Sequence, residues 1–413
     1  MKKSYAIVFF LLVGVFLLQS VQAQETAFRK HINYLASDAL GGRLPGTAGD
    51  TLAVHYIRET LTLYGYKPIF DDGLQSFCYA FGLKQDSCTV RDTIWTFNVA
   101  MMLEGSDPEL KKECLVIGAH YDHLGRANFG GSRTPDAHAI HYGADDNASG
   151  VAMMLELAQK MVGEKPKRTL MVVAFGAEEQ GIIGSKYFVS HFPDSLPKPV
   201  LMVNLDMVGR LNEKKALEIN GTGTFSSAED LLNVTPNPDS LHLTMIKGGF
   251  GPSDHTAFYG NNIPVLFFTT GVHYDYHTPE DKAEKINYSG MEKVYDYILH
   301  IVDTLMNVSV TPEYQKIGNE TSAQSPKFKV TFGIIPDFNN VYEGEGMRAD
   351  FVTTGKPADK AGMKNGDIIL QIGDKQIDNI QDYMERLSEL KAGEKVYVKI
   401  KRETEILTLT IDL

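Results

Sequence analysis

Four short apolar runs rich in β-branched residues alternate with segments of helical periodicity between Cys114 and Thr270. The runs are Leu115–Ala119, Thr169–Phe175, Val200–Leu205 and Pro264–Thr269. Short runs of this kind are typical of strands buried on both faces. Apolar residues recur at helical spacing in Ser149–Val162, after Gly184, and in Ser289–Met306. Because strands alternate with helices, the sequence predicts an α/β fold with a mostly parallel central sheet flanked by helices on both faces.

Residue types that bind metals stand directly after these runs. His120 follows the first run, Glu178 and Glu179 follow the second, and Asp206 follows the third. Since sites in such sheets form at the carboxyl ends of the strands, we expect these side chains to meet. The full set of candidate ligands is His120, Asp146, Glu179, Asp206 and His277.

The five candidates suit two zinc ions. Imidazole and carboxylate are zinc ligands, and three protein ligands per ion leave room for water. Five residues can serve two ions only if one is shared, and Asp146, in a loop rich in Gly and Asn, is our candidate for the bridge. Three converging carboxylates would repel one another without cations. The sequence therefore predicts two Zn²⁺ ions as cofactors.

Two further acidic residues have expected roles in catalysis. Glu178 precedes the candidate ligand Glu179 and so faces another way; we expect it to be the general base that deprotonates a metal-bridging water. Asp122 lies two residues after His120 and is expected to orient its imidazole. The alternatives are a pair of solvated glutamates and an exposed loop aspartate.

The net charge of −12 argues against binding to nucleic acid or to an anionic membrane surface. Lys2 and Lys3 precede an apolar stretch, Ala6–Leu18, and Ala23 fits a signal-peptidase site. We therefore expect a signal peptide at residues 1–23 and a periplasmic or extracellular protein with no transmembrane segment in the mature chain.

Cysteines and composition add two structural expectations. Export permits a disulfide between Cys78 and Cys88, and two buried thiols are the alternative. Residues 308–326 are rich in Ser, Thr, Asn, Gln and Pro and predict a linker. It would join a domain at residues 24–307 to a second domain at 327–413, in which we expect a helix at Asn379–Leu390 and strands at Lys395–Lys401 and Glu405–Leu413.

The metal-ligand motifs resemble those of the exported di-zinc aminopeptidase family, which also contains glutamate carboxypeptidase and glutaminyl cyclase. The resemblance runs from about Asn33 to Met306 and includes Leu40–Arg43. It implies the zinc-exopeptidase fold, with the five candidates as ligands in the order of the family, Asp146 as the bridge, Glu178 as base and Asp122 in support. The family also places Asp254 and His255 near the substrate pocket; the alternative, which we prefer, is a structural turn before a short helix.

Residues 327–413 resemble a circularly permuted bacterial PDZ domain. The motifs are Phe332–Ile335, Pro357–Ile369 and Ile372–Ile377. Such domains add a peptide C-terminus as an extra strand, and Gly333 would let the backbone approach its carboxylate. The resemblance implies a peptide groove at Phe332, Gly333, Ile334 and Ile335. A packing or dimerisation domain is the alternative.

Together these features predict an exported di-zinc exopeptidase whose substrates are peptides. An aminopeptidase fits best. A carboxypeptidase or glutaminyl cyclase of the same family is one alternative. A catalytically inactive peptide-binding scaffold is another, although that reading predicts the loss of a ligand or of Glu178, and both are present.

Overall fold

A computed structural model describes residues 25–85, 88–126, 131–134, 138–317, 330–336, 344–353, 355–378 and 380–413. The expected signal peptide at residues 1–23 lies outside them. The chain divides into two compact units: residues 1–271 and 275–318 form the first, and residues 272–274 and 319–413 form the second. No helix among the described residues is long and apolar enough to cross a membrane.

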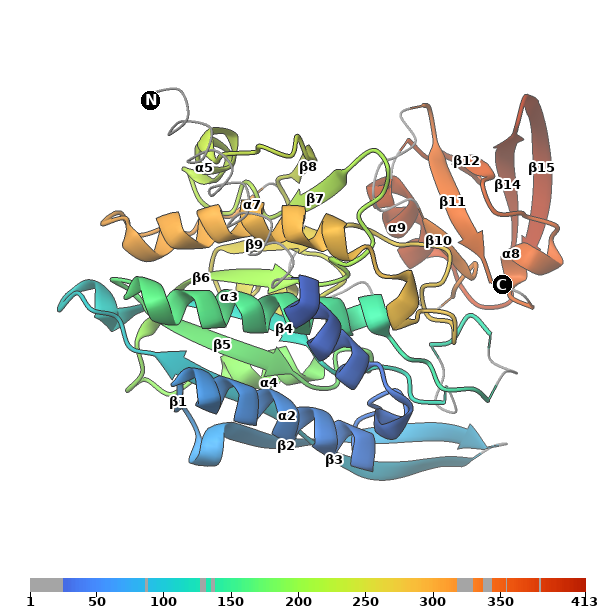
Figure 1. The fold of residues 1–413 in the computed structure, drawn as a ribbon. Helices are drawn as coiled ribbons and strands as arrows, with labels where there is room; N and C mark the ends of the chain where they lie inside the picture. The colour runs from blue at the N-terminus through green and yellow to red at the C-terminus, as the bar shows by residue number, and fades with distance from the viewer. Residues whose placement is uncertain are drawn as a thin grey trace, which may run out of the picture. The chain divides into compact units, whose positions relative to one another are not determined.

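A sheet of nine strands forms the centre of the first unit within the described residues (Figure 1). The strands are β1 (Lys67–Pro68), β2 (Leu74–Gln85), β3 (Cys88–Leu103), β4 (Glu113–His120), β5 (Thr169–Phe175), β6 (Lys198–Leu205), β7 (Ala216–Asn220), β8 (His242–Ile246) and β9 (Val265–Thr269). Their order is β1-β3-β5-β4-β6-β9-β7-β8, and β2 pairs with β3. The inner strands β5, β4, β6 and β9 run parallel. These four are the strands predicted from the apolar runs.

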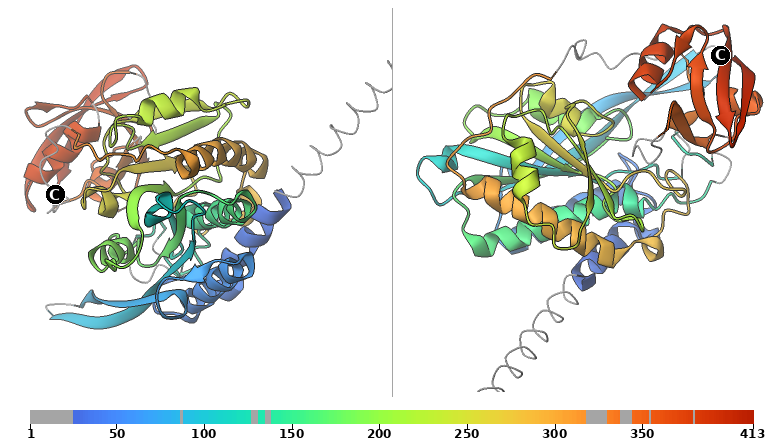
Figure 2. Two further views of the ribbon diagram at one scale, coloured as in Figure 1. Left: turned by 90° about the vertical axis from the view of Figure 1, so that its left-hand side faces the viewer. Right: turned by 90° about the horizontal axis from the view of Figure 1, so that it is seen from above.

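Helices cover both faces of this sheet, as expected (Figures 1 and 2). Alternate residues of each inner strand enter different cores, which explains why the runs are continuously apolar. One core contains Leu115 and Ile117 with the helices α2 (Ala48–Tyr64), α3 (Gly150–Glu164) and α7 (Tyr288–Asn307). The other contains Val116 with α4 (Ile183–Ser190) and α6 (His255–Tyr259). The helix α5 (Ala228–Val234) packs with the first core through Leu232, and the helical residues 25–35 do so through Phe28 and Ile32.

The long hairpin of β2 and β3 decides whether Cys78 and Cys88 can form a disulfide. Cys78 pairs with Trp95 and Gln85 pairs with Cys88, so the cysteines lie far apart along the ladder. At about 3.4 Å per residue the separation is roughly 24 Å, whereas a disulfide needs Cα atoms within about 7 Å. Cys78 is accordingly a free thiol.

The first residues of the expected linker are part of the first unit. Tyr314 forms an isolated β-bridge with Phe225, and the amide of Gln315 donates to Thr224 O at 2.7 Å. The amide of Ile317 donates to the hydroxyl of Tyr259 at 2.9 Å. The segment that can act as a linker is therefore shorter than residues 308–326, and residues 318–326 lie outside the described residues.

The second unit is an antiparallel sheet with two helices. Its strands are β10 (Ile334–Pro336), β11 (Met347–Val352), β12 (Ile368–Ile372), β13 (Lys375–Gln376), β14 (Lys395–Arg402) and β15 (Glu405–Asp412), and its helices are α8 (Pro357–Lys360) and α9 (Ile380–Glu389). The order is β10-β11-β12-β14-β15, with β13 paired to β12. The predicted helix and the last two strands are confirmed.

Candidate metal centre

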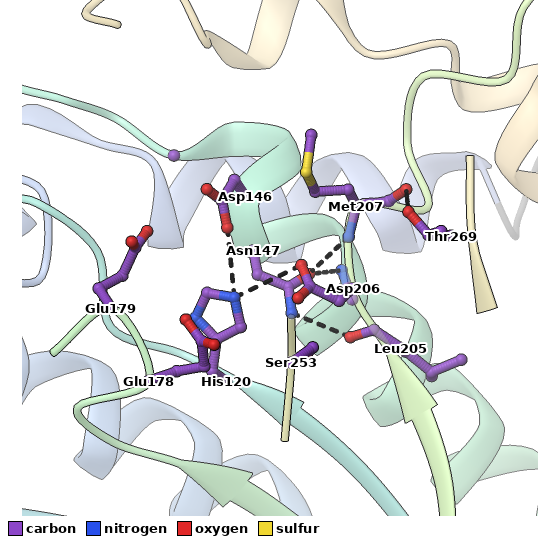
Figure 3. Close-up of polar contacts among 12 residues, drawn as sticks. His120, Asp146, Asn147, Glu178, Glu179, Leu205, Asp206, Met207, Ser253 and Thr269 are labelled. Atoms are coloured by element: carbon purple, nitrogen blue, oxygen red, sulfur yellow. Dashed lines mark hydrogen bonds and ion pairs between the residues drawn. The ribbon is translucent and has the colours of Figure 1, made fainter. Parts of the chain in front are cut away.

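The parallel strands bring three of the predicted ligands to one edge of the sheet. His120 is the last residue of β4, Glu179 follows β5, and Asp206 follows β6. The pairing of β4 with both neighbours sets these ends side by side. Figure 3 shows His120, Asp146 and Asp206 pointing toward one another, with Glu178 beside them.

Asp146 lies in the turn Ala144–Ser149, which precedes α3. Gly143 begins the turn in the left-handed region at φ 56°, and a Cβ there would meet the carbonyl of Asp146. Asn147 ties the turn to the end of β6: its Nδ2 donates to Leu205 O at 2.9 Å, and its Oδ1 accepts from the amide of Met207 at 3.3 Å. The turn is thus held by tertiary contacts next to Asp206.

The five predicted ligands converge into two groups that share Asp146. In the first, His120 Nε2 lies 3.2 Å from Asp146 Oδ1 and 3.4 Å from Asp206 Oδ1. In the second, His277 Nε2 lies 3.1 Å from both Asp146 Oδ2 and Glu179 Oε2. Donors around a tetrahedral ion with bonds of ~2.0–2.1 Å are about 3.3 Å apart. The spacing in both groups fits such an ion.

The tautomers of the two histidines also fit metal binding. His120 Nδ1 lies 3.3 Å from the carbonyl of Asp122, and His277 Nδ1 lies 2.9 Å from the carbonyl of Gly131. A carbonyl only accepts, so each Nδ1 carries the hydrogen and each Nε2 presents a lone pair to carboxylate oxygens. Lone pairs facing one another at this distance require a cation or a proton between them.

In the absence of metal, only protons can supply this positive charge. Burial lowers the pKa of His120, but the charge of Asp206 and hydrogen bonds to carboxylates outweigh it and raise this pKa well above the usual value. Burial likewise opposes a higher pKa at His277, and Glu179 and Asp146 overcome it. Burial would raise the pKa of Glu179, yet His277 holds it at about 2. The group is therefore built to receive positive charge.

His123 is a further donor in the second group. With Asp146 and Glu179 it forms a set of potential ligand atoms within 4.8 Å of one another. However, its Nδ1 lies 2.7 Å from Glu179 Oε1 and 3.8 Å from Asp146 Oδ2. The first distance is that of a charge-assisted hydrogen bond and is too short for two donors on one ion. We therefore assign His123 to orienting Glu179, whose other oxygen faces His277.

Asp122 makes a contact that its expected role did not include. Its carboxylate accepts hydrogen bonds from the amides of Glu178 at 3.0 Å and Glu179 at 3.3 Å. Its Oδ1 lies 3.8 Å from His120 Nδ1, while its own backbone carbonyl faces that nitrogen more closely. The Asp122 side chain thus lies near His120 and also positions the segment that carries the expected base.

Glu178 itself is only partly buried and takes part in neither group of donors. Burial raises its pKa well above the ordinary value, against the opposing charge of His120, and nearby Asp254 and Glu179 raise it further. This direction favours the protonated form, which a general base must reach once it has accepted a proton.

Asp254 and His255, the predicted substrate-binding pair, are fully buried. Burial raises the pKa of Asp254 to about 7, and the charges of Asp122 and Asp206 contribute to this. His255 stacks on Phe267 with ring centroids 4.5 Å apart, and burial lowers its pKa to about 3. These surroundings support the structural alternative for His255. They place Asp254 within the electrostatic field of the metal centre.

Sequence reasoning assigned no individual role to three residues that pack around the site. The Arg43 side chain is fully buried and donates only to backbone carbonyls among the described residues. The buried carboxylate of Asp281 accepts from the amides of Asp145 and Asp146 at 3.0–3.1 Å. Tyr276 stacks on His277 at 3.8 Å, and burial raises its pKa so that the phenol stays neutral. The only signals in the sequence were the place of Arg43 in the motif Leu40–Arg43 and the nearness of Tyr276 and Asp281 to His277.

The expected peptide groove of the second unit lies along β10. Phe332 is buried and meets Tyr383 of α9 edge-on, with centroids 5.9 Å apart. Gly333 has a φ of 74°, and a Cβ there would meet the side chain of Lys356. β10, which begins at Ile334, pairs only with β11 among the described residues, and the side chain of Ile335 lies outside them. Within the part of the chain that the structure describes, one edge of β10 is therefore without a strand.

Comparisons with known proteins agree with both units. Residues 98–302 match Peptidase family M28, and residues 320–413 match the PDZ domain. Aminopeptidase YwaD from Bacillus subtilis is 34% identical over 173 residues, which are 38% of this chain and 36% of YwaD.

Two solved structures show the same fold. BSAP, a zinc aminopeptidase from Bacillus subtilis, matches with a TM-score of 0.56 at 18% identity, covering 70% of this chain and 98% of that one. A glutaminyl cyclase from Bacteroides thetaiotaomicron matches with a TM-score of 0.51 at 18% identity, covering 67% and 97%.

The chain spans between 36% and 66% of the length of the first curated relatives it matches. The matched segment nevertheless includes every strand end that carries a predicted ligand. These matches place residues 98–302 in peptidase family M28 and residues 320–413 in the PDZ domain family.

Proposed function

We propose that this chain is an exported aminopeptidase that holds two Zn²⁺ ions and uses Glu178 as its general base. The observation that carries the proposal is the pair of three-donor groups joined at Asp146, with donor separations of 3.1–3.4 Å. His120 and Asp206 would hold one ion, Glu179 and His277 the other, and Asp146 both. Bound Zn²⁺ supplies Lewis acidity, which activates water near neutral pH and polarises a carbonyl.

Residues of the chain perform the remaining steps. Glu178 accepts a proton from the attacking water and donates it to the leaving amine. Asp122 holds the amides of Glu178 and Glu179, and so keeps the base next to the ligand while both act. The general base alone accounts for about 10²–10⁴-fold of the rate.

The acidic side chains around the site favour binding of the amino end of a peptide over its carboxyl end. Burial raises the pKa of Glu178 and of Asp254, and the charges of neighbouring carboxylates, with Asp206 among them, raise both pKa values further, as expected in a negative field. A negative field attracts an ammonium group. The nearby cations are engaged by the protein: Arg210 Nη2 donates to Asp275 at 2.9 Å, and Arg133 Nη1 donates to Tyr276 O at 3.2 Å. A carboxypeptidase would need such groups for its substrate.

For the PDZ unit we propose binding of an extended peptide end beside β10. The edge of β10 offers main-chain hydrogen bonds, and Gly333 lets the carboxylate approach the backbone. Phe332, Gly333, Ile334 and Ile335 would form this groove.

A panel of peptides with free or blocked termini tests the enzyme, with products followed by mass spectrometry and zinc measured on the same preparation. We expect close to two zinc ions per chain and stepwise loss of residues from free N-termini only. N-acetylated peptides should resist, and C-terminal amides should be cleaved normally. Release from the C-terminus would point to the carboxypeptidase alternative, and a product lighter by ammonia to the cyclase.

A further inference from the structure

The turn that carries Asp146 is bracketed by two buried groups of opposite charge. On one side the guanidinium of Arg43 donates to Tyr142 O at 2.7 Å and to Gly143 O at 2.8 Å. On the other side Asp281 receives three consecutive amides of the turn. Ala144 N donates to its carbonyl at 3.1 Å, and Asp145 N and Asp146 N donate to its carboxylate at 3.0–3.1 Å.

The signs of the two charges match the backbone dipoles between them. A cation faces the carbonyl oxygens of the segment and an anion faces its amide hydrogens, so each charge stabilises the same backbone conformation. This conformation is not one that local sequence maintains, because Gly143 is left-handed and Asp146 and Asn147 have non-helical dihedral angles. Tertiary anchors are therefore needed to hold it.

The same two residues also reach the other ligand segments. Arg43 Nε donates at 2.7 Å to Tyr121 O, the carbonyl next to His120 in the sequence. Asp281 lies four residues after His277, in the same loop. The contacts therefore join the segments of His120, Asp146 and His277, which together serve both proposed ions.

Arg43 differs from an ordinary structural ion pair. It is fully buried, yet its four hydrogen bonds among the described residues all go to backbone carbonyls. Its charge is balanced at longer range: burial lowers its pKa to about 10, and Asp146, Asp122, Asp281 and Glu179 oppose that change. The carboxylates that would bind metal are thus also its counter-charges.

We propose that Arg43 and Asp281 form a charge clamp on residues 142–146 that positions the bridging carboxylate of Asp146 and thereby sets the affinity for both metal ions. The inference rests on the two-metal site of the proposed function. Arg43 and Asp281 are positioning residues, because neither has a side-chain atom in the two donor groups.

The test measures zinc binding by the folded apo protein of full length. Arg43→Lys and Asp281→Asn are compared with two matched controls. Arg168→Lys alters another fully buried arginine, which donates to the carbonyls of Leu305 and Val308. Arg168 directly precedes β5 and so lies at the opposite end of this strand from the metal centre. Asp367→Asn alters a buried carboxylate of the PDZ unit that accepts a backbone amide.

Circular dichroism and thermal melting of each apo variant identify the folded preparations, and competition with a chromogenic chelator gives the zinc affinities. We expect both clamp variants to bind both ions about 10–100-fold more weakly, as is usual when partners of metal ligands are lost. The controls should bind like the wild type even where they melt earlier. Asp206→Asn, which removes a ligand of one ion only, should keep one tight site.

Wild-type affinity in folded Arg43→Lys and Asp281→Asn would overturn the clamp, and so would an equal loss in Arg168→Lys. If Arg43→Lys does not fold, the Asp281→Asn result decides. A wild-type protein that binds no zinc would instead overturn the proposed function, and the clamp with it.

Discussion

A buried aspartate in each unit shows how differently the two units treat charge. In the PDZ unit, the carboxylate of Asp367 accepts two hydrogen bonds from Arg402, at 2.8 and 2.7 Å, and one from the amide of Lys364 at 2.8 Å. In the peptidase unit, the side chain of Asp146 faces the Nε2 lone pairs of His120 and His277. The charge of Asp367 is balanced by a residue of the protein, whereas the charge of Asp146 is arranged to be balanced by a bound cation.

The difference separates a group that stabilises a fold from one that prepares a site. A bidentate arginine with a backbone amide satisfies a carboxylate by itself. Converging carboxylates and imidazoles without an internal cation cost stability until metal binds. Perturbations at the metal centre should therefore change chemistry and metal-dependent stability, and they should leave the PDZ unit as it is.

The largest effect is expected for Glu178→Gln. The amide cannot accept the proton of the attacking water, so turnover of a small peptide should fall by about 10²–10⁴-fold. Zinc content should stay at the wild-type value because Glu178 belongs to neither donor group. Steady-state kinetics and metal analysis on one preparation check both. A full rate would contradict the role of Glu178, and a loss of zinc would make it a ligand.

Zinc should stabilise the peptidase unit and leave the PDZ unit unchanged. A ligand at 1,000 times its Kd adds about 4 kcal/mol to the folded state it binds. Calorimetry of the apo and zinc-loaded chain should show the melting transition of the peptidase unit rise while that of the PDZ unit stays. Asp146→Asn serves as the control, since it removes the shared ligand and should abolish the rise. An equal shift of both melting transitions would show that zinc does not act on the peptidase unit alone.

Acid should remove a stabilising contribution that His255 makes to the peptidase unit. Burial lowers the pKa of His255 to about 3 from 6.5, so the unfolded chain binds a proton that the folded chain does not. The neutral, buried imidazole therefore contributes to the free energy of unfolding above pH 6.5, and this contribution is lost as the pH falls toward 3. Between pH 6.5 and 5 the loss is about 2 kcal/mol. No histidine follows His300, so residues 319–413 contain no such group.

Melting of the wild type and of His255→Phe at pH 7 and pH 5 measures this contribution. Phenylalanine has a similar ring and cannot be protonated, so the variant should lose less stability on acidification. Parallel behaviour of the two proteins would show that His255 does not titrate in the unfolding reaction.

The smallest effect is expected from the PDZ unit on small substrates. Removal of residues 327–413 should leave the hydrolysis of dipeptides unchanged, because every predicted ligand and Glu178 lie in the peptidase unit. Gly333→Val in the full chain is the matched variant, since its side chain would meet Lys356. If the groove recruits substrate, both changes should raise KM for longer peptides only. A lower kcat for dipeptides would show that the units act together.

The sequence predicted the fold class and the ligand set because both depend on local pattern. Buried strands such as Thr169–Phe175 are continuously apolar, and a ligand after each strand end can be located by counting residues. The structure brings all five predicted ligands together. The cysteine prediction had no such basis, since the register of the β2–β3 hairpin is set by pairing between strands.

Only the tertiary structure decided what surrounds the ligands. Arg43, Asp281 and His123 come from segments remote in sequence, and their hydrogen bonds to the Asp146 turn and Glu179 depend on how those segments pack. By itself, the sequence determined which residues can bind metal and at which edge of the sheet they stand, because strand polarity follows from the order of elements. The orientation of the ligand side chains depends on buried charges and polar groups that satisfy one another across the fold, and no local pattern encodes those contacts.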